Sequence, residues 1–69
     1  MILGQRLREL RQQNQIKQYE LAQILDVDPT TVNKYESGEN IPELKTLIKI
    51  ADYFDVSLDY LVGRADYKI

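Results

Sequence analysis

Residues 18–36 read Gln-Tyr-Glu-Leu-Ala-Gln-Ile-Leu-Asp-Val-Asp-Pro-Thr-Thr-Val-Asn-Lys-Tyr-Glu, and this stretch decides the fold of the chain. Apolar residues in its first half recur at helical spacing, at Leu21, Ala22 and Leu25. Because they fall on one face of a helix, they predict a helix over residues 18–25.

A second helix is expected directly after a tight turn at residues 26–27. Asp28 is a favourable N-cap, because its carboxylate can accept a backbone N–H from the next turn. Pro29 fits the first helical position, where no N–H is needed. The helix then runs to about residue 36 or 37, and Gly38 can end it.

The two sides of this second helix differ in chemistry. At about 100° per residue, Val32, Tyr35 and Glu36 share an inner side that is apolar apart from the glutamate. The outer side carries short polar side chains and one cation: Thr30, Asn33, Lys34 and Ser37. Such a face suits the base edges of a DNA major groove, although many surface helices have a polar outer side. The preceding helix, the turn and the cap together favour the DNA-binding interpretation.

Further motifs follow one another at fixed spacing over residues 3–63. They are Leu7-Arg8-Glu9-Leu10-Arg11, Gln18-x-x-Leu21-Ala22, Val27, Val32, Tyr35-Glu36-x-Gly38-Glu39, Pro42-x-Leu44-x-x-Leu47, Ala51-x-x-Phe54-x-Val56-Ser57-Leu58 and Leu61-x-Gly63. In this order the chain resembles the phage-repressor and Cro-like helix-turn-helix family, also called XRE. The resemblance implies an all-α, compact five-helix, lambda-repressor-like fold. It assigns residues 1–63 to a helix-turn-helix DNA-binding domain and residues 64–69 to a short C-terminal tail.

The resemblance also implies how double-stranded DNA would be bound. The helix at about residues 29–37 would dock in the major groove and contact bases through Thr30, Asn33 and Lys34. The DNA phosphates would be contacted by Gln18, Thr31, Ser37, Asn40 and Lys45. Lys49 lies one turn beyond Lys45 and is expected to stay in solvent.

The first helix is expected over about residues 3–13, with an apolar stripe that includes Leu7 and Leu10. Arg11 lies on the flank of that stripe, whereas Arg8 is expected to point away from it. By the resemblance, Arg11 forms a largely buried structural ion pair with Glu36.

Three positions depart from the family pattern. Asp26 stands where glycine is usual, so a left-handed backbone is expected there, which aspartate tolerates better than most residues. Lys17 replaces the usual Ser or Thr cap and cannot accept a backbone hydrogen bond. Pro29 replaces a residue that often reads a base, and it can offer only ring contacts.

The second half of the chain predicts two more helices. The helix over about residues 43–54 is expected to be the main core helix, with an apolar stripe of Leu44, Leu47, Ile48, Ala51 and Phe54. Ser57 is expected to cap a last helix over residues 58–62, which Gly63 ends.

A homodimer interface is expected near the C-terminus, at Tyr53, Tyr60 and Val62. Apolar residues that cluster on a small domain favour an interface, and relatives often dimerise through this end. A two-fold dimer would place two reading helices about 34 Å apart, one DNA turn, on a palindromic site.

Composition restricts the function classes. Cysteine and histidine are absent, so no disulfide, thiolate metal site or histidine base is expected, and a reducing cytoplasm suits the chain. No apolar run is long enough to span a membrane, and no signal-peptide pattern is present. The formal net charge is −2, and the whole excess of anions lies after residue 49. A small basic footprint predicts weak non-specific DNA binding that depends strongly on salt.

The expected function is therefore a sequence-specific DNA-binding transcriptional regulator, and the family favours a repressor. The alternative is an antitoxin or protein-interaction module with the same fold. No effector domain is expected in 69 residues, so control would come from concentration, proteolysis or a regulatory protein partner. An enzyme is not expected, because Asp52, Asp55 and Asp59 have no histidine, cysteine or phosphate loop beside them, and no cofactor is implied.

Overall fold

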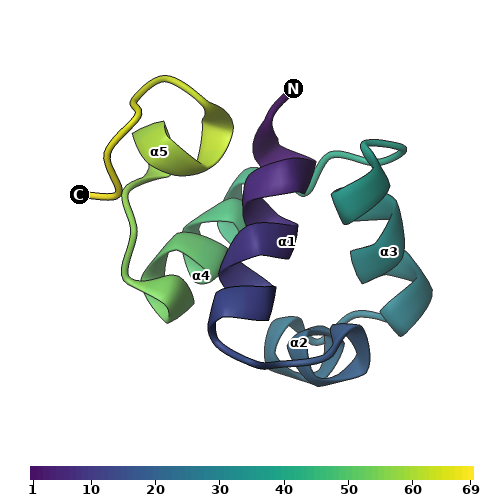
Figure 1. Ribbon diagram of the computed structural model, residues 1–69. Helices are drawn as coiled ribbons and strands as arrows, with labels where there is room; N and C mark the ends of the chain where they lie inside the picture. The colour runs from purple at the N-terminus through teal and green to yellow at the C-terminus, as the bar shows by residue number, and fades with distance from the viewer.

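Five helices and no strand make up the computed structural model, which describes residues 1–69 (Figure 1). They are α1 (Leu3–Gln13), α2 (Gln18–Leu25), α3 (Pro29–Ser37), α4 (Leu44–Phe54) and α5 (Leu58–Val62). In Figure 1, α1 stands between α3 on one side and α5 on the other, with α2 below it and α4 behind it toward the lower left. The predicted helices are all present, and α4 begins one residue later than expected.

The helix ends follow largely from local sequence. At the start of α2, the Lys17 backbone N–H donates to Glu20 Oε1 at 2.8 Å, which is one half of a capping box, while the Lys17 side chain accepts no bond in return. Asp26 ends α2 in the left-handed region at φ 59°, as predicted. Ser57 Oγ accepts the Tyr60 N–H at 3.0 Å and caps α5, also as predicted.

The predicted cap on α3 is only half correct. Asp28 occupies the N-cap position and Pro29 the first helical position, but the Asp28 carboxylate accepts no hydrogen bond. Its side chain stays in solvent, while its backbone carbonyl accepts the N–H groups of Thr31 and Val32 at 2.9 and 3.3 Å. Gly38 then ends the helix at φ 85°, a conformation that glycine adopts without strain.

All five helices contribute side chains to one hydrophobic core. Its fully buried side chains are Leu7, Leu21, Val32, Ile50 and Leu61. The predicted stripe of α4 is partly wrong, because Leu44 and Ile48 are 67% and 42% exposed whereas Ile50 is completely buried. Apolar residues occupy more than one side of this helix, and the packing against α2 and α5 selects the side that carries Ile50 and Ala51.

The residues after Gly63 fold back onto the domain. The Ser57 backbone N–H donates to the Lys68 carbonyl at 2.6 Å, and Lys68 Nζ donates to Gln13 Oε1 of α1 at 3.0 Å. The sequence assigns no structure to this tail, which the contacts nevertheless hold in place.

Arg6 connects α1 to the tail. Its guanidinium lies 4.2 Å from the Tyr60 ring centroid and donates to the backbone carbonyls of Tyr60 and Ala65, the latter at 2.7 Å. Tyr60, which is predicted at the dimer interface, is thereby covered and only 9% exposed, so little of its ring is left for a partner. No helix in this structure combines the length and the apolar character that a membrane span requires.

Candidate nucleic-acid interface

The exposed side of α3 carries the residues predicted to contact bases. The inner residues Val32, Tyr35 and Glu36 are buried against α1 and α2, which fixes the direction of the opposite side. Thr30 and Asn33 on that side are exposed. Hydroxyl and amide groups in this position are available for hydrogen bonds to another molecule.

Lys34, the cation on this side, forms an ion pair with Glu39. Lys34 Nζ lies 3.8 Å from Glu39 Oε2, and both side chains are well exposed, so the pair is weak and readily exchanged for another anion. The predicted phosphate contact Ser37 uses its hydroxyl at the end of α3. The Ser37 hydroxyl donates to the Lys34 carbonyl at 3.1 Å and accepts the Glu39 N–H at 3.4 Å. Its one proton is therefore already used in a hydrogen bond within the protein.

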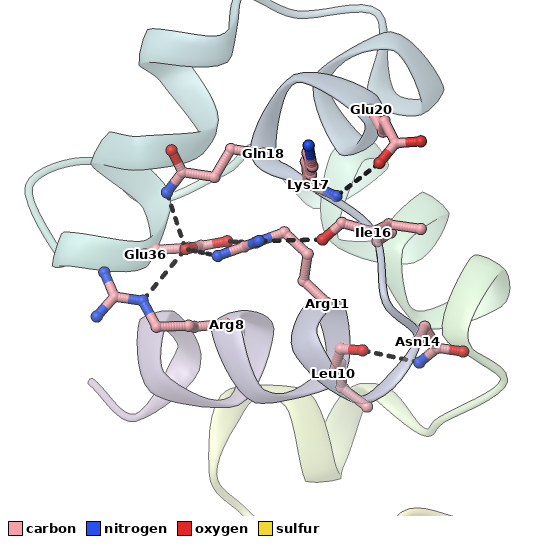
Figure 2. Close-up of polar contacts among 9 residues, drawn as sticks. All are labelled: Arg8, Leu10, Arg11, Asn14, Ile16, Lys17, Gln18, Glu20 and Glu36. Carbon is pink, nitrogen blue, oxygen red and sulfur yellow. Dashed lines mark hydrogen bonds and ion pairs between the residues drawn. The ribbon is translucent and has the colours of Figure 1, made fainter.

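The carboxylate of Glu36 joins α1, α2 and α3 (Figure 2). Arg11 donates from Nε to Glu36 Oε2 at 2.6 Å and from Nη2 to Oε1 at 3.1 Å, so the predicted ion pair is present. Gln18, at the start of α2, donates from Nε2 to the same Oε1 at 3.0 Å. The Glu36 side chain is completely buried, and it therefore fixes α3 relative to both earlier helices.

Arg8 is the member of this cluster that sequence reasoning missed. It was expected to point away, but its Nε donates to Glu36 Oε1 at 3.2 Å while its side chain remains 49% exposed. The available signal is the spacing of three residues between Arg8 and Arg11, which brings both side chains to one side of α1.

Two opposing effects set the pKa of Glu36. Burial raises the pKa of this carboxyl, whereas the hydrogen bonds from Arg11, Gln18 and Arg8 lower it, and the net result lies below the usual 4.5. The carboxylate therefore stays ionised, and a negative charge faces the arginines at neutral pH.

An open groove of about 570 Å³ runs between the end of α2, the inner flank of α3 and the start of α4. It brings together three of the predicted phosphate contacts, Thr31, Asn40 and Lys45. Lys49, expected in solvent, also lines it, and so do the acidic residues Asp26 and Glu43. The groove is thus lined by two lysines and two carboxylates, and its formal net charge is zero.

Tyr35 lines the same groove from the end of α3. Burial raises the pKa of its phenol, and the nearby charge of Glu43 raises it further. The hydroxyl therefore keeps its proton at neutral pH and remains a hydrogen-bond donor. No sequence pattern separated this residue from the core, because its ring is buried as predicted.

Comparisons with known proteins show the family and the fold of the chain. A family model described as Helix-turn-helix matches residues 7–61. The HTH-type transcriptional regulator ImmR of Bacillus subtilis (strain 168) is 38% identical over 64 residues, which cover 93% of this chain and 50% of ImmR. The cryptic phage CTXphi transcriptional repressor RstR of Vibrio cholerae serotype O1 is also 38% identical over 64 residues, 93% of this chain and 57% of RstR.

Among solved structures, the P22 c2 repressor in complex with a synthetic operator superposes with a TM-score of 0.82 at 26% identity. The superposition covers 88% of this chain and 92% of that one, so the predicted phage-repressor fold is confirmed. The chain spans only 50–57% of the length of the two curated relatives. By its matched residues and its fold, the chain belongs to the helix-turn-helix family of the phage-repressor and Cro-like type.

Proposed function

We propose that the protein is a sequence-specific DNA-binding transcriptional regulator that represses by covering a promoter. The observation that carries the proposal is the exposed polar side of α3, which lies beside the groove lined by Thr31, Asn40 and Lys45. The names of the relatives ImmR and RstR, and the operator complex of the P22 c2 repressor, support the same function. A regulator of this kind meets its DNA in the cytoplasm.

In the proposed complex, α3 enters the major groove. Thr30, Asn33 and Lys34 contact base edges, with Asn33 able to pair with adenine and Lys34 with guanine. The groove beside α3 receives the DNA backbone, where Thr31, Asn40 and Lys45 donate to phosphate oxygens. Gln18 has a second amide N–H beyond the one that it gives to Glu36, and this second N–H is available for a phosphate.

The protein is proposed to bind a palindromic site as a homodimer. Of the predicted interface residues, Tyr53 is 47% exposed and Val62 half-buried, whereas Tyr60 offers little surface because it is only 9% exposed. Sedimentation at micromolar concentrations is the direct measurement. A dimer that Tyr53→Ser weakens is the expected result, and a monomer would contradict the proposal.

A protein-interaction module is the second candidate function. The observation in its favour is the exposed apolar side of α4 and the loop before it, where Ile41, Leu44 and Ile48 are 62%, 67% and 42% exposed. Exposed apolar side chains that lie together are typical of binding surfaces for other proteins. This candidate becomes the leading one if the folded chain binds no DNA.

The test of the proposed function is selection of bound duplexes from a random DNA pool at moderate salt. We expect one enriched motif, palindromic if the protein binds as a dimer. Asn33→Ala and Lys34→Ala should weaken selection at particular base positions, because each removes a group that reads base edges.

The control for Lys34→Ala is Arg64→Ala, which removes one cation from the exposed tail on the other side of α1 (Figure 1). It should leave the motif unchanged. No enrichment with a chain that circular dichroism shows to be folded would reject the proposed function.

A further inference from the structure

The buried carboxylate of Glu36 pairs with two guanidinium groups, although one would neutralise its charge. Arg11 alone supplies two hydrogen bonds and one full charge to it, in the bidentate geometry that suits a carboxylate. Arg8 adds a second guanidinium to the same carboxylate. One anion thus faces two cations, and the cluster as a whole carries one excess positive charge.

The two arginines differ in what they have left to donate. Arg11 is 13% exposed at its side chain and uses Nε, Nη1 and Nη2, the Nη1 group donating to the Ile16 carbonyl at 3.0 Å. Arg8 is 49% exposed and uses only Nε. Figure 2 shows its two terminal nitrogens pointing away from the carboxylate, where they have no partner in the protein.

Arg8 and Gln18 meet at one oxygen of Glu36. Arg8 Nε and Gln18 Nε2 bond to the same oxygen, Glu36 Oε1, at 3.2 and 3.0 Å. The two nitrogens are therefore within two hydrogen-bond lengths of each other. A phosphate group bound by Gln18 at the start of α2 would be within reach of the Arg8 guanidinium.

We infer that Arg8 is a DNA-phosphate ligand, which together with Gln18 grips the backbone next to α3. The inference rests on the proposed function and adds a contact to it. The bond to Glu36 holds the guanidinium in a fixed direction, and its two terminal nitrogens match the oxygens of a phosphate. Glu36 thereby links the reading helix directly to a backbone contact.

A purely structural role explains these observations less well. An ion pair with one half-exposed partner contributes little to stability, and Glu36 keeps its bonds from Arg11 and Gln18 without Arg8. The surplus charge and the free donors have no use within the protein.

The test is the salt dependence of DNA binding, measured by fluorescence anisotropy with Arg8→Gln and with the charge-matched control Arg64→Gln. The probes are the duplex selected from the random pool and a duplex of scrambled sequence. For Arg8→Gln we expect weaker binding to both, and a slope of log affinity against log salt that is smaller by about 0.9 per subunit. Arg64→Gln should match the wild type.

The inference is overturned if Arg8→Gln keeps the wild-type slope, or if it changes the preferred sequence while the slope stays constant. The second result would show that Arg8 only positions α3. Failure of the wild type itself to bind either duplex would instead overturn the proposed function, and the inference with it.

A measurement on the wild type avoids any dependence on the folding of the variant. Side-chain NMR of the guanidinium groups should show the Arg8 terminal N–H signals shifting when the selected duplex is added, with those of Arg64 unchanged. Shifts of the α3 backbone amides without a shift of Arg8 would mean that DNA binds and Arg8 takes no part.

Discussion

At the scale of single residues, Glu36 shows what a buried charge requires. Its carboxylate is completely enclosed, and four N–H groups from Arg8, Arg11 and Gln18 satisfy its two oxygens. Burying such a group without these bonds would cost far more free energy than a domain of this size can supply. The stability of the chain therefore depends on one side chain more than on most others.

We expect Glu36→Ala to lower the free energy of unfolding by about 3 kcal/mol, because removal of one partner leaves Arg11 buried without its anion. Chemical denaturation followed by circular dichroism measures this value. Glu9→Ala, which removes an exposed glutamate of α1, should change it little. An unchanged midpoint for Glu36→Ala would mean that the ion pair is absent in solution.

The same residue predicts a pH dependence. Because the folded-state pKa of Glu36 lies below the usual 4.5, the unfolded state binds more protons as the pH falls. The contribution of this carboxylate to stability is present above the usual pKa and is lost as the pH falls through the lowered one.

Unfolding curves between neutral and acidic pH should therefore show a steeper loss of stability for the wild type than for Glu36→Gln, which cannot titrate. Glu9→Gln, at an exposed site, serves as the matched control and should follow the wild type. Parallel curves for Glu36→Gln and the wild type would contradict the assigned pKa direction.

At the scale of helices, α1 and α3 approach closely at Gly4. A side-chain carbon added there would lie 2.8 Å from the Tyr35 carbonyl oxygen and would also meet the carbonyl of Glu36. Both obstacles are backbone atoms, which cannot move aside without shifting α3.

We expect Gly4→Ala to destabilise the fold by about 2 kcal/mol, within the usual range for overpacking, although alanine favours helices. Thermal unfolding measures the effect, and Gln5→Ala at the exposed neighbouring position should cost almost nothing. A Gly4→Ala variant more stable than the wild type would show that the helices have room to separate.

Sequence patterns predict the bounds of the helices well here, but they predict less well which side of a helix faces the core. Caps such as Ser57 and breaks such as Gly38 act through neighbouring atoms, so the residue order contains the information. The inward side of α4 depends on α2 and α5, and a helix with apolar residues on several sides fits two rotations. For that reason Leu44 was predicted inside and is exposed, while the buried Ile50 was overlooked.

At the scale of the whole molecule, contacts between residues far apart in the sequence determine features that sequence patterns do not predict. Arg6 bonds to carbonyls 54 and 59 residues further on, and no periodicity connects such positions. This side chain covers Tyr60 and helps to hold the tail, together with the hydrogen bonds that Lys68 makes. In the candidate interface, the motifs predicted exposed residues of α3, whereas Arg8, Lys49 and Tyr35 were not among the predicted contacts.

Arg6→Ala should lower the free energy of unfolding by about 2 kcal/mol, because two carbonyls lose a charged donor and the Tyr60 ring loses its cation. It should also release the tail, so that trypsin cleaves faster after Arg64. Lys68→Ala loses only an exposed bond to Gln13 and should keep the wild-type stability and cleavage rate. Equal cleavage rates for Arg6→Ala and the wild type would mean that other contacts suffice.

The placement of the carboxyl end has a practical consequence for building chimeric proteins. The tail runs beside α5, and α1 separates it from α3 (Figure 1). A fluorescent reporter or a dimerising module joined after Ile69 would therefore start its path on the opposite side from the reading helix. Such a fusion should leave the groove beside α3 unobstructed, which makes this end the suitable attachment point.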